Sequence, residues 1–321
     1  MSSNTKIEWA DNNFNPWVGC TKVSPGCDNC YAESWSKRSG MVQWGPHMPR
    51  IRTSAANWKQ PVKWNDMAEL LGIRYRVFCA SLADVFDNEA PAQWRADLFA
   101  LIARTPHLDW LLLTKRVGNA NTMIELATEH LDFYGDGTAF EVKPWPNVWL
   151  GATVCNQDEA DRDIPKLLKI PAAKRFLSME PLLGSVCVFS DITGELLHTS
   201  GDAYNPGSVD WVIVGGESGH AARAMHHAWV IQLRDQCEAA FVPFLFKQWG
   251  EFVSSHQHPD INALYERSSS GGWLGADGQI SLGKDANPRT GDEHVFKVGK
   301  KLAGRLLDGR EWNETPDKGV A

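Results

Sequence analysis

The residues best suited to chemistry in this chain are three cysteines close to the N-terminus. Cys20, Cys27 and Cys30 form a C-x6-C-x2-C array within residues 19–31, and Ser24-Pro25-Gly26 lies between the first two. Because this tripeptide is a turn signal, we expect the three thiols to converge on one loop. Three soft thiolates suit an iron–sulfur cluster or zinc. The odd total of 7 Cys argues against a disulfide framework.

The number of thiols distinguishes the two metals. A structural zinc site normally has four protein ligands, and no second Cys or His pair follows at the usual spacing, so zinc needs a distant fourth ligand. A 4Fe–4S cluster held by three cysteines leaves one iron open for a substrate. The spacing therefore favours a cluster at Cys20, Cys27 and Cys30, with zinc, or cysteines without a metal, as the alternatives.

The elements that position this loop follow a strand–helix alternation. Short continuous apolar runs, typical of strands covered on both faces, occupy residues 76–81, 110–114, 148–154, 175–179, 211–214 and 243–247. Helical patterns cover residues 91–104, 119–130, 157–168 and 227–240, and we expect Pro165 to start a new turn. With a short first strand near residues 15–19, the pattern predicts an α/β fold, a partial (β/α) barrel of about six to seven parallel strands.

The composition along the chain indicates where the barrel ends and whether the chain enters a membrane. We expect the barrel to span residues 1–253, with a loop insertion at 182–209, and residues 254–321 to form an irregular C-terminal extension packed on it. With 43% hydrophobic and 22% charged residues and no run of about 18 apolar residues, the chain is not expected to enter a membrane. The N-terminus lacks a secretory signal, so a cytoplasmic location is expected.

A three-cysteine loop after the first strand of such a barrel resembles the radical S-adenosylmethionine superfamily. Over nearly the whole chain, similarity to the phage-encoded three-cysteine-motif family of uncharacterised proteins, related to that superfamily, rests on IEWADNNFNPWVGCTKVSPGCDNCYAE, SLADVFD, LLLTKR, LGATV, SMEPLLG, VIVGGESG, FKQWG and GKKLAGRLLDGREW. The resemblance implies a 4Fe–4S cluster whose open iron binds S-adenosylmethionine, and an electron donor such as flavodoxin or ferredoxin. It also implies the host cytosol as the location if the chain is phage-encoded.

The chain departs from the commonest superfamily pattern, C-x3-C-x2-C. Its first gap is three residues longer, and Asn29 stands where an aromatic residue often lies against adenine. We therefore expect Tyr31 or Trp17 to replace that aromatic residue. Gly215-Gly216-Glu217 resembles the Gly-Gly-Glu element that meets the methionine amino group in related enzymes, although here it follows the sixth strand instead of the second.

Polar residues at the carboxyl ends of the strands are the candidates for binding and catalysis, because the loops of a β/α barrel converge there. As cofactor contacts we expect Asp84 on the methionine ammonium, Ser178 and Glu180 on the ribose, and further contacts from Tyr31, Thr153, Gly215 and Gly216. As catalytic residues we expect Cys155, a hydrogen-atom donor, with Lys115 and Glu217. The alternative is that Lys115, Glu180, Glu217 and Lys247 form a structural charge network.

Residues 34–65 form a basic stretch rich in tryptophan. They include no Asp or Glu but six Lys or Arg and four Trp, in a chain of net charge −7. Cations that track phosphates and indoles that stack on bases are typical of single-strand binding. The candidate nucleic-acid contacts are Arg38, Trp44, Arg50, Arg52, Trp58 and Lys59. The alternative is a connection whose Trp residues pack on the barrel and whose cations are solvated.

Together these features predict a radical S-adenosylmethionine enzyme that acts on a nucleic-acid base or nucleotide, in the modification or repair of phage DNA. One alternative is a non-catalytic nucleic-acid-binding protein stabilised by zinc or by a cluster. A further alternative is a barrel that keeps the cluster only for structure or redox sensing.

Overall fold

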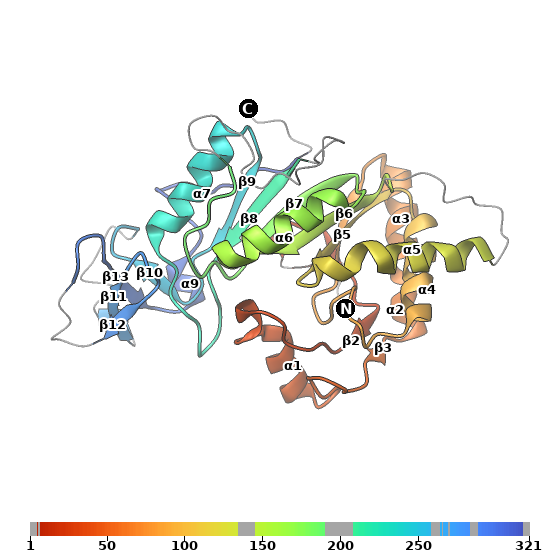
Figure 1. The fold of residues 1–321 in the computed structure, drawn as a ribbon, viewed down its shortest axis with the longest axis horizontal. Helices are drawn as coiled ribbons and strands as arrows, with labels where there is room; N and C mark the ends of the chain where they lie inside the picture. The colour runs from red at the N-terminus through yellow and green to blue at the C-terminus, as the bar shows by residue number, and fades with distance from the viewer. Residues whose placement is uncertain are drawn as a thin grey trace. The chain divides into compact units, whose positions relative to one another are not determined.

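A computed structural model of the chain describes residues 5, 7–133, 145–189, 208–257, 264, 266–268, 270–282 and 288–316. Its main feature is a seven-stranded sheet in which the strands follow one another in chain order (Figure 1). The strands are β1 (Asn12–Asn13), β4 (Tyr75–Cys79), β5 (Leu108–Thr114), β6 (Val148–Thr153), β7 (Lys174–Met179), β8 (Trp211–Gly215) and β9 (Phe244–Gln248). The prediction of an α/β partial barrel is confirmed.

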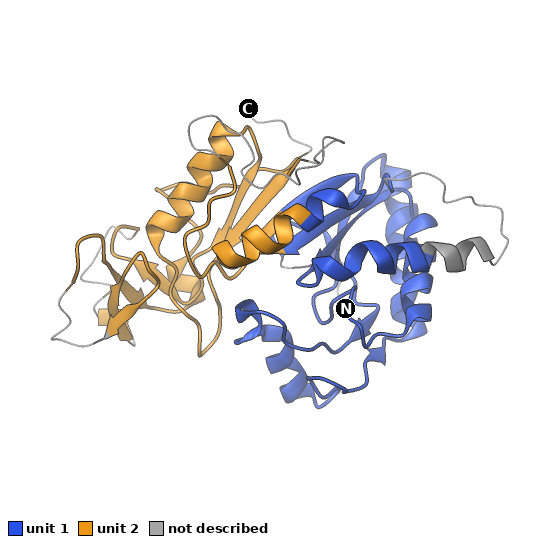
Figure 2. Ribbon diagram, viewed as in Figure 1, with its two compact units in different colours: residues 1–152, 166–176 blue, residues 153–165, 177–321 orange. Residues whose placement is uncertain are grey.

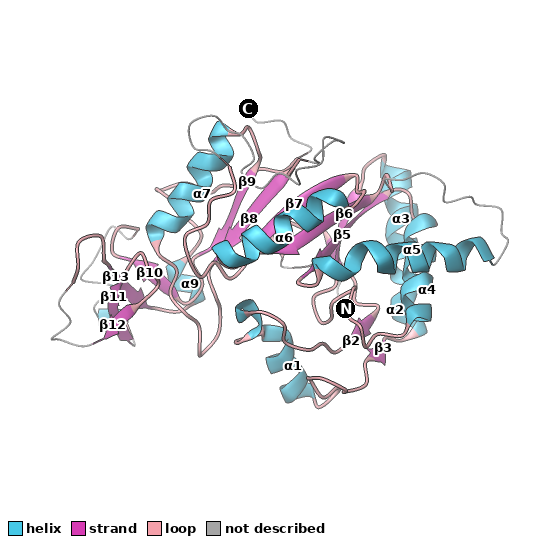
Figure 3. Cartoon of the chain, viewed as in Figure 1, coloured by secondary structure: helices cyan, strands magenta, loops and turns pink. Residues whose placement is uncertain are grey.

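Helices connect these strands (Figure 3). After β4, β5, β6 and β8 come α4 (Ala92–Ala103), α5 (Val117–Phe133), α6 (Gln157–Lys169) and α7 (His227–Ala239). Every residue of β6 and β8 is buried, as the continuous apolar runs predict. Pro165 lies inside α6, so the expected new turn is wrong. The buried neighbours Ile164, Leu167 and Leu168 hold the helix through the proline, because packing outweighs the one backbone hydrogen bond that proline removes.

The first strand differs from the expectation at residues 15–19. β1 joins the main sheet further upstream, where Asn12 and Asn13 pair in parallel with Val77 and Phe78. Strand β2 (Trp17–Val18) instead pairs antiparallel with β3 (Ile51–Arg52) in a separate two-stranded ribbon. Pro16 stands between β1 and β2 and has no N–H to donate to a ladder, which accounts for the interruption.

The basic stretch is structured. It contains most of α1 (Tyr31–Ser39), all of β3 and α2 (Ala55–Trp58), and the start of α3 (Gln60–Leu71). Helix α1 ends at Gly40, which adopts a left-handed conformation with φ 63°. Ser54 caps α2 by accepting a hydrogen bond from the Asn57 backbone N–H.

The chain divides into two compact units (Figure 2). Unit 1 is Met1–Ala152 with Lys166–Phe176, and unit 2 is Thr153–Pro165 with Leu177–Ala321. The boundary expected at residue 253 stays a prediction. Most of the insertion expected at 182–209, residues 190–207, lies outside the described residues. In the described part of the chain, no helix is long and apolar enough to cross a membrane.

The C-terminal part of unit 2 is more regular than its composition suggests. An antiparallel sheet in the order β10-β13-β11-β12 contains β10 (Phe252–Ser254), β11 (Ser270–Leu274), β12 (Ile280–Leu282) and β13 (Glu293–Lys297), and the short helix α9 (Lys300–Ala303) follows. The sequence hides β11 because its residues, SGGWL, include two glycines, which are poor strand formers.

Candidate functional site

The cysteine loop connects β2 with α1 in unit 1. Residues 25–27 form a 3-10 helix, η1 (Pro25–Cys27), capped by Ser24, whose Oγ accepts a hydrogen bond from Gly26 N at 3.1 Å. Cys30 caps α1, and its backbone N–H donates to the Cys27 carbonyl at 3.3 Å. Cys27 and Cys30 therefore lie one turn apart, directly before the first turn of α1.

The loop lies against the end of β4. Gly19 forms a parallel bridge with Ala83, and its N–H donates to the Leu82 carbonyl at 3.0 Å. The Tyr31 hydroxyl donates to the Ser81 carbonyl at 2.5 Å. Both ends of the cysteine loop are thereby attached to the segment that follows β4, as a site at the carboxyl ends of the strands requires.

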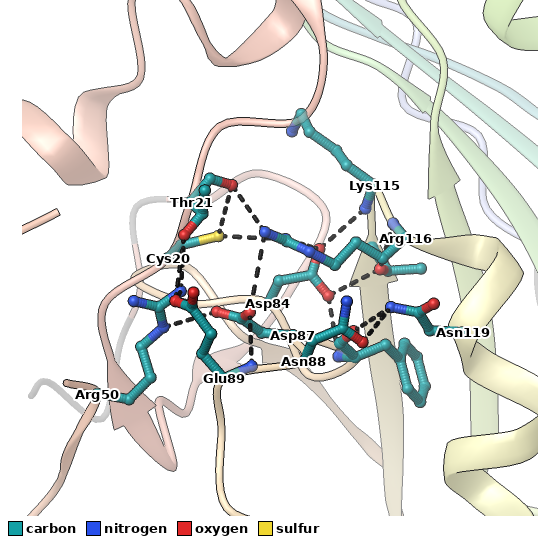
Figure 4. A network of polar contacts seen from close by, with 12 residues as sticks. Cys20, Thr21, Arg50, Asp84, Asp87, Asn88, Glu89, Lys115, Arg116 and Asn119 are labelled. Carbon is teal, nitrogen blue, oxygen red and sulfur yellow. Dashed lines mark hydrogen bonds and ion pairs between the residues drawn. The ribbon is translucent and has the colours of Figure 1, made fainter. Parts of the chain in front are cut away.

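Arg116 is the residue that contacts the first cysteine (Figure 4). Its Nη1 lies 3.3 Å from the Cys20 Sγ, and its Nη2 donates to the Thr21 carbonyl at 2.7 Å. Its Nη1 also lies 3.3 Å from the Asp84 carboxylate. The two N–H arms of one guanidinium group therefore fix both the sulfur and the backbone of the loop.

Asp84 supports Arg116 from a buried position. Its Oδ1 accepts hydrogen bonds from Thr114 Oγ1 at 2.7 Å and from Phe86 N at 2.9 Å. Its Oδ2 accepts from the Lys115 backbone N at 3.0 Å, while the Lys115 side chain points away (Figure 4). Asp84 therefore joins the ends of β4 and β5, and the expected contact with a methionine ammonium stays a prediction.

A second buried arginine completes this network. Arg50 Nε donates to Asp87 at 2.7 Å, and its Nη2 lies 2.5 Å from Glu89 and 2.9 Å from Thr21 Oγ1 (Figure 4). Its guanidinium group is fully buried and its charge is matched inside the protein. Arg50, expected as a nucleic-acid contact, is thus placed in the support of the cysteine loop, because the nearby carboxylates compensate its burial.

The pKa of the Cys20 thiol depends on its burial and on the charges of Asp84 and Arg116. Burial and the negative charge of Asp84 raise the pKa of the Cys20 thiol to about 12, although Arg116 opposes the shift. Burial disfavours the Arg116 charge, but Asp84, Cys20 and Asp87 outweigh burial and raise the pKa of Arg116 above its usual range. Cys20 is therefore a thiol without a metal and must release its proton to bind one.

The three cysteines offer a sulfur-only donor set. Among the described residues, no three His, Cys, Asp or Glu side chains are grouped so that they could hold one metal ion. The cysteine ligands of a 4Fe–4S cluster bind different iron atoms, so they need not group around one ion. Three loop thiols are soft donors that suit an iron–sulfur cluster or, with a fourth ligand, a zinc ion.

In unit 2, several expected cofactor residues lie together. Glu180 forms an ion pair with Lys247 and accepts a hydrogen bond from Ser178 Oγ at 3.4 Å. A Cβ added to Gly215 would lie 3.2 Å from Glu180 Oε2. A Cβ added to Gly216 would lie 1.9 Å from the Trp249 carbonyl oxygen, so Gly216 is required by packing alone.

The remaining unit 2 candidates are buried. Glu217 accepts three hydrogen bonds from Arg223, from its backbone N–H, Nε and Nη2, at 2.7 to 2.9 Å. Thr153 is 3% exposed and Cys155 0% exposed. The Glu180–Lys247 ion pair joins two of the four residues of the structural charge network that the sequence left open, whereas Glu217 pairs with Arg223, which was not among the four. A hydrogen atom can leave Cys155 only if a substrate reaches its thiol, so that role stays a prediction.

One sequence family covers almost the whole chain: its profile matches residues 4–316. The chain belongs to DUF5131, a family described as protein of unknown function. Comparisons of this DUF5131 protein with curated proteins and with solved structures give no match. The family match by itself says nothing about phages or radical S-adenosylmethionine enzymes.

The basic stretch of the DUF5131 protein divides into packed and exposed residues. Arg52 pairs with Asp97 at 2.5 Å and lies over the Trp58 ring, 4.3 Å from its centroid. Trp58 also meets Phe14 edge-on at 5.5 Å. Arg38 and Lys59 are exposed and Trp44 is half-exposed. Packing thus accounts for part of the stretch, as in the alternative given by the sequence.

Sequence reasoning missed Asp87 and Glu89 as parts of the site, and it did not predict that Arg116 contacts Cys20. The signal that could have found them is the charge in two segments after neighbouring strands: SLADVFDNE (81–89), just after β4, and Lys115-Arg116, directly after β5. Charged residues in equivalent positions after β4 and β5 meet because the strands are parallel and adjacent.

Proposed function

We propose that this protein is a radical S-adenosylmethionine enzyme in which Cys20, Cys27 and Cys30 hold a 4Fe–4S cluster. The observation that carries the proposal is the attachment of a three-cysteine loop to the carboxyl end of β4, within a parallel sheet in chain order. A cluster held there would supply one electron, taken from a flavodoxin- or ferredoxin-type donor, for the reductive cleavage of S-adenosylmethionine to methionine and a 5′-deoxyadenosyl radical.

The chain's own residues have supporting roles in this proposal. Arg116 donates to the Cys20 sulfur and fixes the Thr21 carbonyl, so it orients the first ligand. Asp84 holds Arg116 in place and keeps it charged. A hydrogen bond to a ligand sulfur also tunes the reduction potential of a cluster, so Arg116 is a positioning residue.

The proposed substrate is a base of nucleic acid or a nucleotide, in DNA modification or repair. Its support is the positive charge of residues 34–65, which begin four residues after Cys30 and contain no acidic residue. Arg38 and Lys59 are exposed there and make no ion pair with a described residue. The expected contact of Tyr31 with S-adenosylmethionine belongs to the same proposal, while those of Ser178, Glu180 and Gly215 stay predictions from the sequence.

Anaerobic reconstitution with iron and sulfide tests the proposal. The full chain is expected to gain the visible absorbance and reduced-state EPR signal of a 4Fe–4S cluster, and to form 5′-deoxyadenosine when dithionite and S-adenosylmethionine are added. The Cys20→Ala/Cys27→Ala/Cys30→Ala variant should lose all three signals. Cys187→Ala, at a half-buried cysteine outside the loop, is the matched control and should keep them.

Two results would contradict the proposal. Stoichiometric zinc in the purified protein, together with no binding of S-adenosylmethionine by calorimetry, would overturn the proposal in favour of a zinc-stabilised binding protein. An intact cluster that never yields 5′-deoxyadenosine would leave a structural or redox-sensing role and would also overturn it.

A further inference from the structure

Unit 1 contains a cavity of about 620 Å³ within the region of the basic stretch. Its walls come from α1 and the residue after its C-cap, from the β2–β3 ribbon, and from α2 and the start of α3. This volume is within the usual range for small-molecule pockets. The residues that matter for its chemistry are Trp35, Met41, Ile51, Arg52, Asn57 and Gln60.

The faces of the cavity are apolar and exposed. Met41 is 50% and Ile51 39% exposed, so both present apolar surface at the cavity. The indole of Trp35 is half-exposed and, among the described residues, makes no aromatic contact or hydrogen bond. An open indole face beside aliphatic side chains suits a flat aromatic ligand.

The edge of the cavity carries oriented polar groups. Asn57 Nδ2 donates to the Asn15 carbonyl at 3.0 Å and to Thr53 Oγ1 at 2.9 Å, which leaves its Oδ1 as an acceptor. Gln60 Nε2 donates to the Ala56 carbonyl at 3.4 Å, so its Oε1 is likewise an acceptor. Arg52 uses Nη1 on Asp97 and keeps further donors. A lining that combines apolar side chains with hydrogen-bond acceptors and donors matches a nucleobase.

Three cations stand next to this cavity in the helices that line it. Arg38 follows Trp35 by three residues, Lys59 follows Ala56 by three, and Lys63 follows Gln60 by three, so helical spacing places each cation near a lining residue. All three are exposed and none pairs with a described residue. Cations on two helices suit successive phosphates of a strand.

We propose that this cavity holds one base of single-stranded DNA, with Arg38, Lys59 and Lys63 on the neighbouring phosphates. The choice of DNA as the ligand rests on the proposed function. A recognition site that includes α1, the helix capped by Cys30, is thereby added to that function. The base stacks on Trp35, and its edge is read by Asn57, Gln60 and Arg52. Stacking gives affinity with little sequence preference.

The test is the binding of a fluorescein-labelled oligothymidylate of about 12 nucleotides to the full chain without a cluster, followed by anisotropy over a range of salt. The Arg38→Gln/Lys59→Gln/Lys63→Gln variant should lower the slope of log affinity against log salt by about 2, because each lost contact with single-stranded DNA removes about 0.7. The charge-matched control, Arg267→Gln/Lys300→Gln/Lys301→Gln, should leave the slope unchanged.

Filling the cavity separates the base from the phosphates. Ala56→Trp, at an exposed position that lines the cavity, should weaken binding about tenfold without changing the salt slope. Leu70→Trp, 78% exposed on α3 and not among the lining residues, is its control. Equal binding by the wild type and both cavity and cation variants would overturn the inference.

Two further arms make the result specific. Thymidine monophosphate that competes as well as the oligonucleotide would show a free-nucleotide pocket and overturn the assignment to a strand. Formation of 5′-deoxyadenosine without DNA tests the cluster alone, and DNA binding by the cluster-free chain tests the cavity alone. Failure of this inference and failure of the proposed function are therefore distinguishable.

Discussion

At the scale of single residues, the site depends on two buried guanidinium groups. Arg50 and Arg116 form ion pairs with three carboxylates, those of Asp84, Asp87 and Glu89. A third buried guanidinium group, that of Arg95, interacts electrostatically with Asp84 and Asp87, so three cations match three anions. A Cys20 thiolate would add one uncompensated negative charge, which a bound metal ion or cluster core would offset.

Replacement of Arg116 should show how far the network depends on it. Arg116→Met leaves the carboxylate of Asp84 buried without its charged partner, so we expect the free energy of unfolding in urea to fall by about 3 kcal/mol. Asp84→Asn in the same chain should recover part of the loss, since it removes the uncompensated charge. A double variant that is as unstable as the sum of the two single variants would contradict this coupling.

At the scale of elements, short segments hold the functional groups in place. The loop between β2 and α1 is fixed at Gly19 and Tyr31, and both contacts go to residues just after β4. In unit 2, β13 begins with Glu293, which accepts hydrogen bonds from His227 N at 2.7 Å and from Ser254 Oγ at 3.0 Å. Glu293 thus connects β13 with β10 and with the first residue of α7.

The stability of this junction should depend on pH. Burial raises the pKa of Glu293 from 4.5 to about 7, so the folded state holds this proton more tightly than the unfolded state. The contribution of protonated Glu293 to the free energy of unfolding is complete below pH 4.5 and is lost as the pH rises towards about 7. Across this window the free energy of unfolding of the wild type should therefore fall by about 3 kcal/mol relative to that of Glu293→Gln, measured in urea.

The comparison with Glu293→Gln removes other titrations from the result. Burial lowers the pKa values of His226 and His227, which adds an opposite pH dependence, but both histidines are present in both proteins. A constant difference between the two proteins over the whole window would show that Glu293 stays ionised in the folded state.

At the scale of the whole molecule, net charge conceals the distribution of charge. The chain carries −7, yet residues 34–65 contain six cations and no acid. The structure pairs Arg50 and Arg52 with acidic residues from 87–97, which lie outside that stretch in sequence. Lys37 is exposed and pairs with Glu33, so the exposed cations that make no ion pair with a described residue are Arg38, Lys59 and Lys63, in the helices that line an apolar cavity.

Cluster loading should stabilise the folded chain as a whole. A group bound only by the folded state adds its binding free energy to folding, so we expect the Tm to rise after anaerobic reconstitution. The Cys20→Ala/Cys27→Ala/Cys30→Ala variant should show the same Tm with and without iron and sulfide. A rise of Tm in that variant would mean that the added iron binds elsewhere.

Much of the fold could be predicted from local pattern. The runs at 110–114 and 211–214 match β5 and β8 because strands buried on both faces are apolar throughout. The pattern failed at β1, whose two asparagines carry no apolar signal. It also failed at β11, a strand that depends on its partners β12 and β13 more than on its own residues.

The sequence by itself determined the cysteine loop, the order of strands and helices, and the clustering of charge, because all three are written in contiguous residues. Only the tertiary structure decided that Arg116 meets Cys20, that Arg50 is buried against Asp87, and that Trp35 lines an open cavity. Arg116 and Cys20 are 96 positions apart, Arg50 and Asp87 are 37 apart, and Trp35 and Gln60, which both line the cavity, are 25 apart. Such contacts depend on which strands become neighbours and on what each burial must compensate, and neither is visible in a local window of sequence.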